Sequence, residues 1–219
     1  LHTELEEKLN EKSQIEINYQ ENAKKRQISE FMNKNEKVYG FLYELITPLQ
    51  KKLELPIKVS LLKYLNYLVV EDSVTALAVS EFLKGKDISC DVLVLENVPK
   101  SDNYEAIRLK LGGLGNLVID LIDCKKKGLK NAINYFLKNM VFCADTNNIE
   151  HLRKEGFYTV ITMDGTVYKK SSIVGGHYKN LQQYSFNYAS YANASVHETS
   201  KQIAKEIEQI NTRIKEIEK

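Results

Sequence analysis

Hydrophobic and polar positions follow different patterns at the ends of the chain and in its middle. Near the C-terminus, apolar residues recur at the three-to-four spacing of a coiled-coil heptad, at Val196, Ile203, Ile207, Ile210, Ile214 and Ile217. Residues 1–36 contain no glycine or proline and predict an exposed, partly amphipathic helix. Because a short polar helix is unstable alone, we predict that residues 1–36 and 186–219 pair as an antiparallel coiled-coil stalk. The alternative is a terminal helix that packs on its own domain.

The middle of the chain repeats a helix, strand, helix, strand pattern. In each copy a short apolar run leads into an aspartate that is followed by Ser or Thr and then by a helical pattern, at residues 67–82 and 140–152. Asp72 and Asp145 are therefore predicted to cap helices before any catalytic role is considered. A second strand follows in each copy, at 91–96 and 159–164, and a further strand is predicted at 117–122. The pattern predicts an α/β (α+β) fold of two pseudo-symmetric helix–strand halves, 37–116 and 117–185.

Composition narrows the class of protein. The 219 residues are 43% hydrophobic and 27% charged, which is typical of a folded chain with one sizeable core or two small ones. The charged N-terminal residues and the lack of a long apolar run favour neither secretion nor membrane insertion. Cys90, Cys124 and Cys143 are odd in number and widely spaced, which predicts buried free thiols in a reducing compartment.

One glycine-rich segment invites a nucleotide-binding interpretation, at residues 112–116. Phosphate loops follow a strand and open a helix, and Lys-Ser/Thr ends the nucleoside-triphosphate version. Here the pattern predicts a helix before the glycines and a strand after them. We therefore interpret the segment as a helix C-cap and turn.

The other candidate chemistry is sparse, and we expect no enzyme, metal site or cofactor. The histidines are scattered, and Ser171-Ser172 lacks a nucleophile motif. Asp120 and Asp123 could act as paired carboxylates, but surface positions at a strand end are the commoner explanation. Two basic runs, Lys125-Lys126-Lys127 and Lys169-Lys170, can contact DNA phosphates or can be solvated turns.

Several segments together resemble the hinge domain of the structural maintenance of chromosomes (SMC) family. They are Val38-Tyr39-Gly40-x-Leu42, LVIDLI at 117–122, MVFCADTNNIEHL at 140–152 and TVITMDGTVYKKSSIVGG at 159–176. The resemblance covers the domain order of residues 38–176, and within the family it is strongest to the cohesin subunit whose hinge pairs with that of its SMC partner. The family usually has glycine or serine before its paired glycines, whereas this chain has Val174.

The resemblance implies a dimerisation hinge on a coiled-coil stalk. Family hinges pair head to tail through two small contacts, each of which extends a sheet across the boundary. It implies one interface patch in the second half, at Ile173, Val174, Gly175 and Gly176, where glycines let another backbone approach. The matching edge in the first half is expected at Val92, Leu93, Val94 and Leu95. An ordinary loop is the alternative for the glycine pair.

The same resemblance implies the biological setting. We expect a nuclear, chromosome-associated protein whose partner is the hinge of another SMC subunit, with self-pairing in isolation left open. DNA contact is expected to be weak and independent of sequence, through the two lysine runs. ATP hydrolysis in the family belongs to head domains, so we expect no ATPase activity from these residues. The competing hypothesis is a stand-alone nucleic-acid-binding protein with coiled-coil ends, which would bind DNA strongly as a monomer.

Overall fold

The computed structural model describes residues 24–99, 104–175, Leu181 and Phe186. The chain divides into two compact units, Leu1–Glu36 with Ala189–Lys219 and Lys37–Tyr188, and each is treated by itself. In the first unit the description covers residues 24–36, which are helical over 24–32. The isoleucine positions of the predicted coiled coil and the proposed pairing of the two ends lie outside the described residues.

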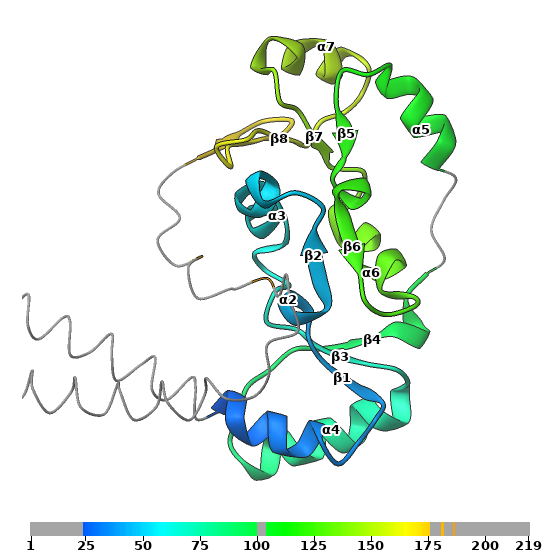
Figure 1. Cartoon of the computed structure of the whole chain (residues 1–219), viewed down its shortest axis with the longest axis vertical. Helices are drawn as coiled ribbons and strands as arrows, with labels where there is room; N and C mark the ends of the chain where they lie inside the picture. The colour runs from blue at the N-terminus through cyan, green and yellow to red at the C-terminus, as the bar shows by residue number, and fades with distance from the viewer. Residues whose placement is uncertain (1–23, 100–103, 176–180, 182–185, 187–219) are drawn as a thin grey trace, which may run out of the picture. The chain divides into compact units, whose positions relative to one another are not determined.

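The second unit contains two successive sets of helices and strands (Figure 1). The elements of the first set are β1 (Val38–Phe41), α2 (Leu42–Leu45), β2 (Ile46–Pro48), η1 (Lys51–Leu53), α3 (Glu54–Leu61), β3 (Leu68–Val70), α4 (Ser73–Gly85), β4 (Val92–Val94) and η2 (Leu95–Asn97). The second set begins after α5 (Tyr104–Leu111). It comprises β5 (Asn116–Leu117), η3 (Val118–Leu121), β6 (Ile122–Cys124), α6 (Leu129–Leu137), β7 (Val141–Phe142), η4 (Thr146–Asn148), α7 (Ile149–Lys154), β8 (Val160–Ile161), β9 (Val167–Tyr168) and β10 (Ile173–Val174).

Each set builds its own sheet. The first has the order β1-β3-β4, with β3 and β4 parallel and β1 antiparallel to β3. The second has the order β10-β9-β8-β7-β5, in which β7 and β8 are parallel and β5 is antiparallel to β7. The hairpin of β9 and β10 extends this second sheet by two strands beyond the part that repeats. The predicted mixed α/β architecture with an internal repeat is therefore confirmed.

Equivalent helix starts explain why the repeat is visible in the sequence. The Asp72 side chain accepts a hydrogen bond from the Thr75 amide at the start of α4. Asp145 accepts one from the Asn147 amide at the start of η4, which leads into α7. Both aspartates follow a parallel strand that has a neighbour on each side in its sheet. The free N–H groups of the helix that begins there need an acceptor, so the predicted capping role of both aspartates is confirmed.

The two halves are joined by an antiparallel strand pair that sequence analysis missed. β2 of the first set pairs with β6 of the second, in the register Ile46↔Cys124, Thr47↔Asp123 and Pro48↔Ile122. Figure 1 shows the two strands side by side. Flanking backbone bonds match across the pair, because Leu49 N–H donates to the Leu121 carbonyl and Lys125 N–H donates to the Leu45 carbonyl. A two-stranded sheet, with one strand from each half, therefore links the two halves.

The hydrophobic core runs through both halves. Helices α3 and α6 contact each other, and side chains from both sets are completely excluded from solvent, among them Leu42, Ile46, Leu61, Leu65, Leu129 and Ile133. An aromatic contact adds to this junction, because the Tyr64 ring stacks on the Phe136 ring of α6 with centroids 4.0 Å apart. The ring of Tyr67 meets both of these rings edge-on. One continuous hydrophobic cluster therefore spans the two halves.

The prediction of one strand over residues 117–122 is wrong. The chain forms β5 up to Leu117, a 3₁₀ turn over Val118–Leu121, and β6 from Ile122. The run reads as a strand because Leu117, Val118, Ile119 and Ile122 are all buried. A fully buried segment has no alternation that would show where it turns from one sheet into another.

The glycine-rich segment is a turn, as predicted. Helix α5 ends at Leu111 before it and β5 begins at Asn116 after it, the reverse of a phosphate loop. Gly112 and Gly113 have positive φ angles of 55° and 81°. Gly115 is required for another reason, because a Cβ there would lie 2.7 Å from Val141 Cγ1 and 2.8 Å from the Phe142 carbonyl oxygen. These glycines serve the fold.

Candidate dimerisation interface

The second-half patch begins on an edge strand. In the described part of the chain β10 pairs with β9 alone, so its other side ends the five-stranded sheet. Ile173 and Val174 are apolar but remain 65% and 43% exposed. Unpaired backbone groups beside exposed apolar side chains form a surface that another strand can extend. Gly175 follows and is exposed, whereas Gly176 lies outside the described residues.

Among the described residues, nothing sterically requires a glycine at position 175. A Cβ at this position would meet Thr166 at 3.4 to 3.5 Å, close to ordinary van der Waals contact, and the backbone is not left-handed. This environment differs from that of Gly115, where a side chain would collide with β7. The fold of the single chain therefore leaves the glycine at 175 unexplained, and close approach by another backbone would explain it.

The first-half patch also lies on an edge strand. In the three-stranded sheet β4 pairs with β3, and among the described residues its other side is unpaired. Leu93 points into the core with 8% exposure, while Val92 and Val94 are half-buried. Leu95, predicted as part of this strand, instead begins the 3₁₀ turn η2. The strand stops there because Glu96 N–H turns back to the Glu71 carbonyl after β3.

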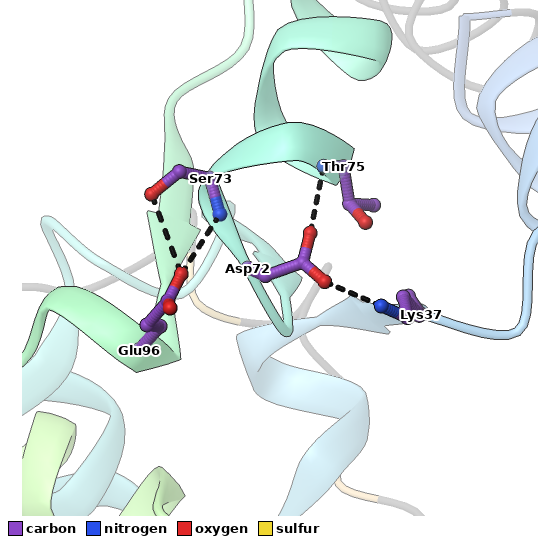
Figure 2. Close-up of polar contacts among 5 residues, drawn as sticks. All are labelled: Lys37, Asp72, Ser73, Thr75 and Glu96. Carbon is purple, nitrogen blue, oxygen red and sulfur yellow. Dashed lines mark hydrogen bonds and ion pairs between the residues drawn. The ribbon is translucent and has the colours of Figure 1, made fainter.

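A polar cluster fixes the ends of β3 and β4 against helix α4 (Figure 2). The Asp72 carboxylate receives the Thr75 amide at 2.8 Å and the Lys37 ammonium at 2.6 Å. The Lys37 hydrogen bond is the main cause that holds the pKa of Asp72 well below its ordinary range, and the Thr75 amide adds to it. The same bond raises the pKa of Lys37. Both groups are therefore charged at neutral pH.

Glu96 forms the other side of this cluster. Its carboxylate accepts a hydrogen bond from the Ser73 amide at 3.3 Å, so the segment that leaves β4 is tied to the first turn of α4 (Figure 2). A carboxylate at this position also interacts favourably with the positive end of the helix dipole. The cluster therefore braces the end of the candidate edge strand. Sequence reasoning did not find Lys37 or Glu96, because neither contact follows a motif.

The β9–β10 hairpin is held at its turns by side chains from its own half. Arg153 of α7 donates from one guanidinium nitrogen to the Lys170 carbonyl at 3.2 Å and pairs through another with Glu150 at 3.1 Å. At the preceding turn, the Asp164 carboxylate accepts hydrogen bonds from the hydroxyls of Thr162 and Thr166. The Thr162 bond is the main cause that lowers the pKa of Asp164. Two-residue strands are weak alone, so these contacts set the position of the edge.

The two predicted lysine runs occupy different turns of the second half. Lys125, Lys126 and Lys127 follow β6, and all three are exposed. The Lys125 ammonium donates to the Glu44 carbonyl at 2.8 Å, and that of Lys126 lies 4.4 Å from the centroid of the Tyr39 ring. Two of these three lysines therefore also hold the second half to the first. Lys169 and Lys170 are exposed in the β9–β10 turn.

The contacts of Asp120 and the partial or complete burial of the three cysteines indicate structural and not catalytic roles. Asp120 receives two hydrogen bonds from Arg108, at 2.7 and 2.8 Å, so its carboxylate is held in an ion pair with a guanidinium. All three cysteines are free, but only Cys143 is fully buried. Burial raises the pKa of Cys124 to about 11, which keeps that thiol protonated at neutral pH.

Two negative findings concern the described residues alone. They contain no cluster of three or more His, Cys, Asp or Glu side chains placed to hold a metal ion. Within the same part of the chain, no helix combines the length and apolar character that a bilayer crossing needs.

The arrangement of two related α/β halves with open edges agrees with a known family. Residues 35–153, more than half of the chain, match the family model described as the SMC proteins flexible hinge domain. The chain belongs to this SMC hinge family.

The chain is similar in sequence to SMC1 proteins of plants and animals. The chain is 28% identical over 141 residues to structural maintenance of chromosomes protein 1 of Arabidopsis thaliana, which covers 64% of this chain and 11% of that protein. It is 24% identical over 211 residues to the Caenorhabditis elegans protein of the same name, which covers 90% of this chain and 16% of the relative. The chain thus spans only a small part of these relatives.

Solved structures show the same fold. An asymmetric dimer of the Geobacillus stearothermophilus SMC hinge domain matches with a TM-score of 0.58 at 16% identity, covering 99% of this chain and 90% of that one. A structure of the folded elbow of cohesin matches with a TM-score of 0.60 at 19% identity, covering 98% of this chain and 31% of that one. The architecture of this chain is therefore that of an SMC hinge.

Proposed function

We propose that this chain is the dimerisation hinge of an SMC1-like subunit and that it joins its own coiled-coil arm to the arm of a partner subunit. Among the described residues each sheet has two edge strands, β1 and β4 in the first half and β10 and β5 in the second. The observation that carries the proposal is that the two predicted patches lie on such edges, at β4 and at β10. Pairing β4 of one hinge with β10 of another would continue one sheet into the next. A second, reciprocal contact between the same two molecules would close the pair.

Two small contacts suffice for a stable pair when they form between the same molecules. Once the first has formed, the second is intramolecular, and its effective concentration is set by the rigid hinge itself. The continuous core and the β2–β6 pair supply that rigidity, because they fix the two halves to one another. The proposed module works by association and not by catalysis.

The finer biological assignment rests on the relatives. Identity to SMC1 proteins supports a cohesin-type complex, in which the hinge would join two arms into a ring for sister-chromatid cohesion and chromosome structure. The natural partner would be the hinge of the other SMC subunit, and the location would be the nucleus and its chromosomes.

DNA contact is a second, weaker role that we propose for the exposed lysines. Lys127, Lys169 and Lys170 are exposed, and the phosphate contacts that such lysines make carry no base information. The stand-alone nucleic-acid-binding protein is the competing function, and it requires strong salt-dependent affinity from an isolated monomer.

Sedimentation velocity separates these functions. The chain is measured alone, with the hinge of a partner SMC subunit, and with a duplex DNA. The proposal predicts a hinge pair at low micromolar concentration and only weak DNA binding. A chain that stays monomeric with every hinge but binds DNA tightly would contradict it.

A further inference from the structure

We propose that the charges beside the two open edges select head-to-tail pairing, so that β10 of this chain recognises β4 of a second copy and rejects another β10. The inference rests on the proposed function and adds what determines the polarity of pairing. It follows from the side chains at the ends of the two strands, because those side chains would meet when the strands do.

The β10 edge is basic at its turn. Lys169 and Lys170 are exposed in the connection that leads into β10. Their position is defined, because Lys169 N–H donates to the Ser172 carbonyl at 2.8 Å and the Lys170 carbonyl is held by Arg153. The Lys170 ammonium lies 5.4 Å from the centroid of the Tyr158 ring, an exposed contact that a stronger anionic partner can replace.

The β4 edge is acidic at both of its ends. Asp91 immediately precedes the strand and is exposed, and Glu96 follows it in η2 and is also exposed. Glu71 is a third exposed acidic residue. It lies beside Glu96, because its backbone carbonyl accepts a hydrogen bond from the Glu96 amide. The nearby cation Lys37 is paired with Asp72 at 2.6 Å, and Lys100, which follows β4 in the sequence, lies outside the described residues. Among the described residues, the flanks of β4 therefore present net negative charge.

Paired strands lie about 4.8 Å apart, so a lysine at the end of one strand reaches a carboxylate at the end of its neighbour. Because β4 is acidic at both ends, the lysines of β10 meet an acidic group whether the new pair is parallel or antiparallel. Contact of β4 with another β4 would instead place carboxylates against carboxylates. Contact of β10 with another β10 would bring two lysine pairs within about 10 Å if the strands ran parallel. If they ran antiparallel, each lysine pair would lie beside Gly175 of the other copy and would meet no carboxylate.

Charges of opposite sign therefore favour the pair that joins β10 to β4 in both directions. Contact of β4 with β4 is opposed by its carboxylates, and contact of β10 with β10 lacks the attraction. Edge strands need such protection, because their free backbone groups pair with any exposed strand. Charges at the rim act mainly on encounter and specificity, so their effect should fall with added salt.

The test measures self-association of the full chain by sedimentation equilibrium at low salt and at about 0.3 M salt, where screening is stronger. The basic edge is reversed in Lys169→Glu/Lys170→Glu. The acidic edge is reversed separately in Asp91→Lys and in Glu96→Lys. The matched control is Lys51→Glu/Lys52→Glu, which changes the same net charge at an exposed lysine pair outside both edges.

We expect the basic-edge variant to self-associate roughly tenfold more weakly at low salt, and the control to stay within about twofold of the parent chain. Mixing the basic-edge variant with one of the acidic-edge variants should restore pairing. Rescue by Asp91→Lys would place the β10 turn at the start of β4, and rescue by Glu96→Lys would place it at the end.

A mixture that pairs no better than its components overturns the inference, and so does a control that weakens pairing equally. If the parent chain pairs with a partner SMC hinge but never with itself, self-recognition through these charges is wrong while the proposed function stands. If it pairs with neither, the proposed function is wrong as well.

Discussion

Thr47 and Asp123 face each other at the centre of the β2–β6 pair, and they occupy the same place in the two repeated halves. The equivalence shows in the backbone bonds on either side: Leu42 N–H donates to the Tyr67 carbonyl in one half, and Val118 N–H donates to the Met140 carbonyl in the other. The strand pair therefore lies on an internal pseudo-two-fold axis. An isologous contact of this kind is usual between subunits, and here it lies within one chain.

A substitution beside this axis tests whether the halves fold as one unit. Ile46 is fully buried opposite Cys124, so Ile46→Ala should lower the free energy of unfolding by about 2 to 5 kcal/mol. The control Leu49→Ala removes a side chain that is 60% exposed and should cost less than about 0.5 kcal/mol. Urea unfolding should remain one transition. Two transitions, with only one shifted, would show that the halves are separate domains.

Sequence reasoning found the elements that repeat a strong local signal and missed those that depend on the tertiary structure. The β3–α4 and β7–α7 segments were predictable, because a short buried strand ends in an aspartate that caps a helix. Strands β2 and β6 are three residues each, which is too short for alternation to show, and their pairing partner lies far along the chain.

The candidate interface also contains features that the sequence could predict and features that it could not. The position of β10 followed from the family resemblance, and its exposed Ile173 and Val174 could not have been distinguished from core residues by composition. Leu95 was misplaced because the chain enters a 3₁₀ turn there, which is closed by a backbone bond from Val98 N–H to the Leu95 carbonyl. Arg153 gave no signal, since its acceptor is a main-chain carbonyl.

The two glycines with opposite surroundings make a matched pair for testing the interface. Gly175→Glu should leave thermal melting nearly unchanged, because Thr166 leaves room for a Cβ, but it should weaken hinge pairing at least several-fold. Gly115→Ala should do the reverse, with a loss of about 1 to 3 kcal/mol in folding stability from collision with β7. If Gly175→Glu unfolds the chain, this glycine serves the fold. If it alters neither property, the interface lies elsewhere.

The Asp72 cluster predicts a pH dependence of stability. Because Lys37 and the Thr75 amide lower the folded-state pKa of Asp72 from 3.8, the folded chain binds this proton less readily than the unfolded chain. The stabilisation is therefore complete above that value and is lost as the pH falls below it. Asp72→Asn, which keeps a capping oxygen, should be less stable than the parent at neutral pH, and the difference should shrink steadily as the pH falls below 3.8. A constant difference between the two would exclude the ion pair as the cause.

The three lysines after β6 should differ in function, with Lys127 serving DNA contact and Lys125 and Lys126 also stabilising the fold. Lys127→Glu should weaken DNA binding uniformly across sequences and flatten its salt dependence, with little change in stability. Lys125→Glu and Lys126→Glu should also lower the melting temperature, because the parent side chains contact Glu44 and Tyr39 of the first half. Fluorescence anisotropy with two unrelated duplexes, alongside thermal melting, measures both effects. Equal melting temperatures for all three variants would contradict this division.

Arg153 should position the β10 edge without supporting the core. Arg153→Ala removes the donor to the Lys170 carbonyl, so amide exchange in residues 168–174 should accelerate in the monomer and pairing should weaken. Glu150→Gln keeps that donor and breaks only the ion pair, and the exposed neighbour Lys154→Ala is the matched control. Both controls should exchange like the parent chain. Faster exchange throughout the unit would instead mean that Arg153 stabilises the whole fold.

Hydrogen exchange with and without a partner hinge tests the central claim most directly, because it reports where the chain is covered. Pairing through the two edges predicts slower exchange at residues 92–94 and 173–175 on association, with little change on α4 or β5. Protection confined to α4 or β5, with both edges exchanging as fast as in the monomer, would contradict the account.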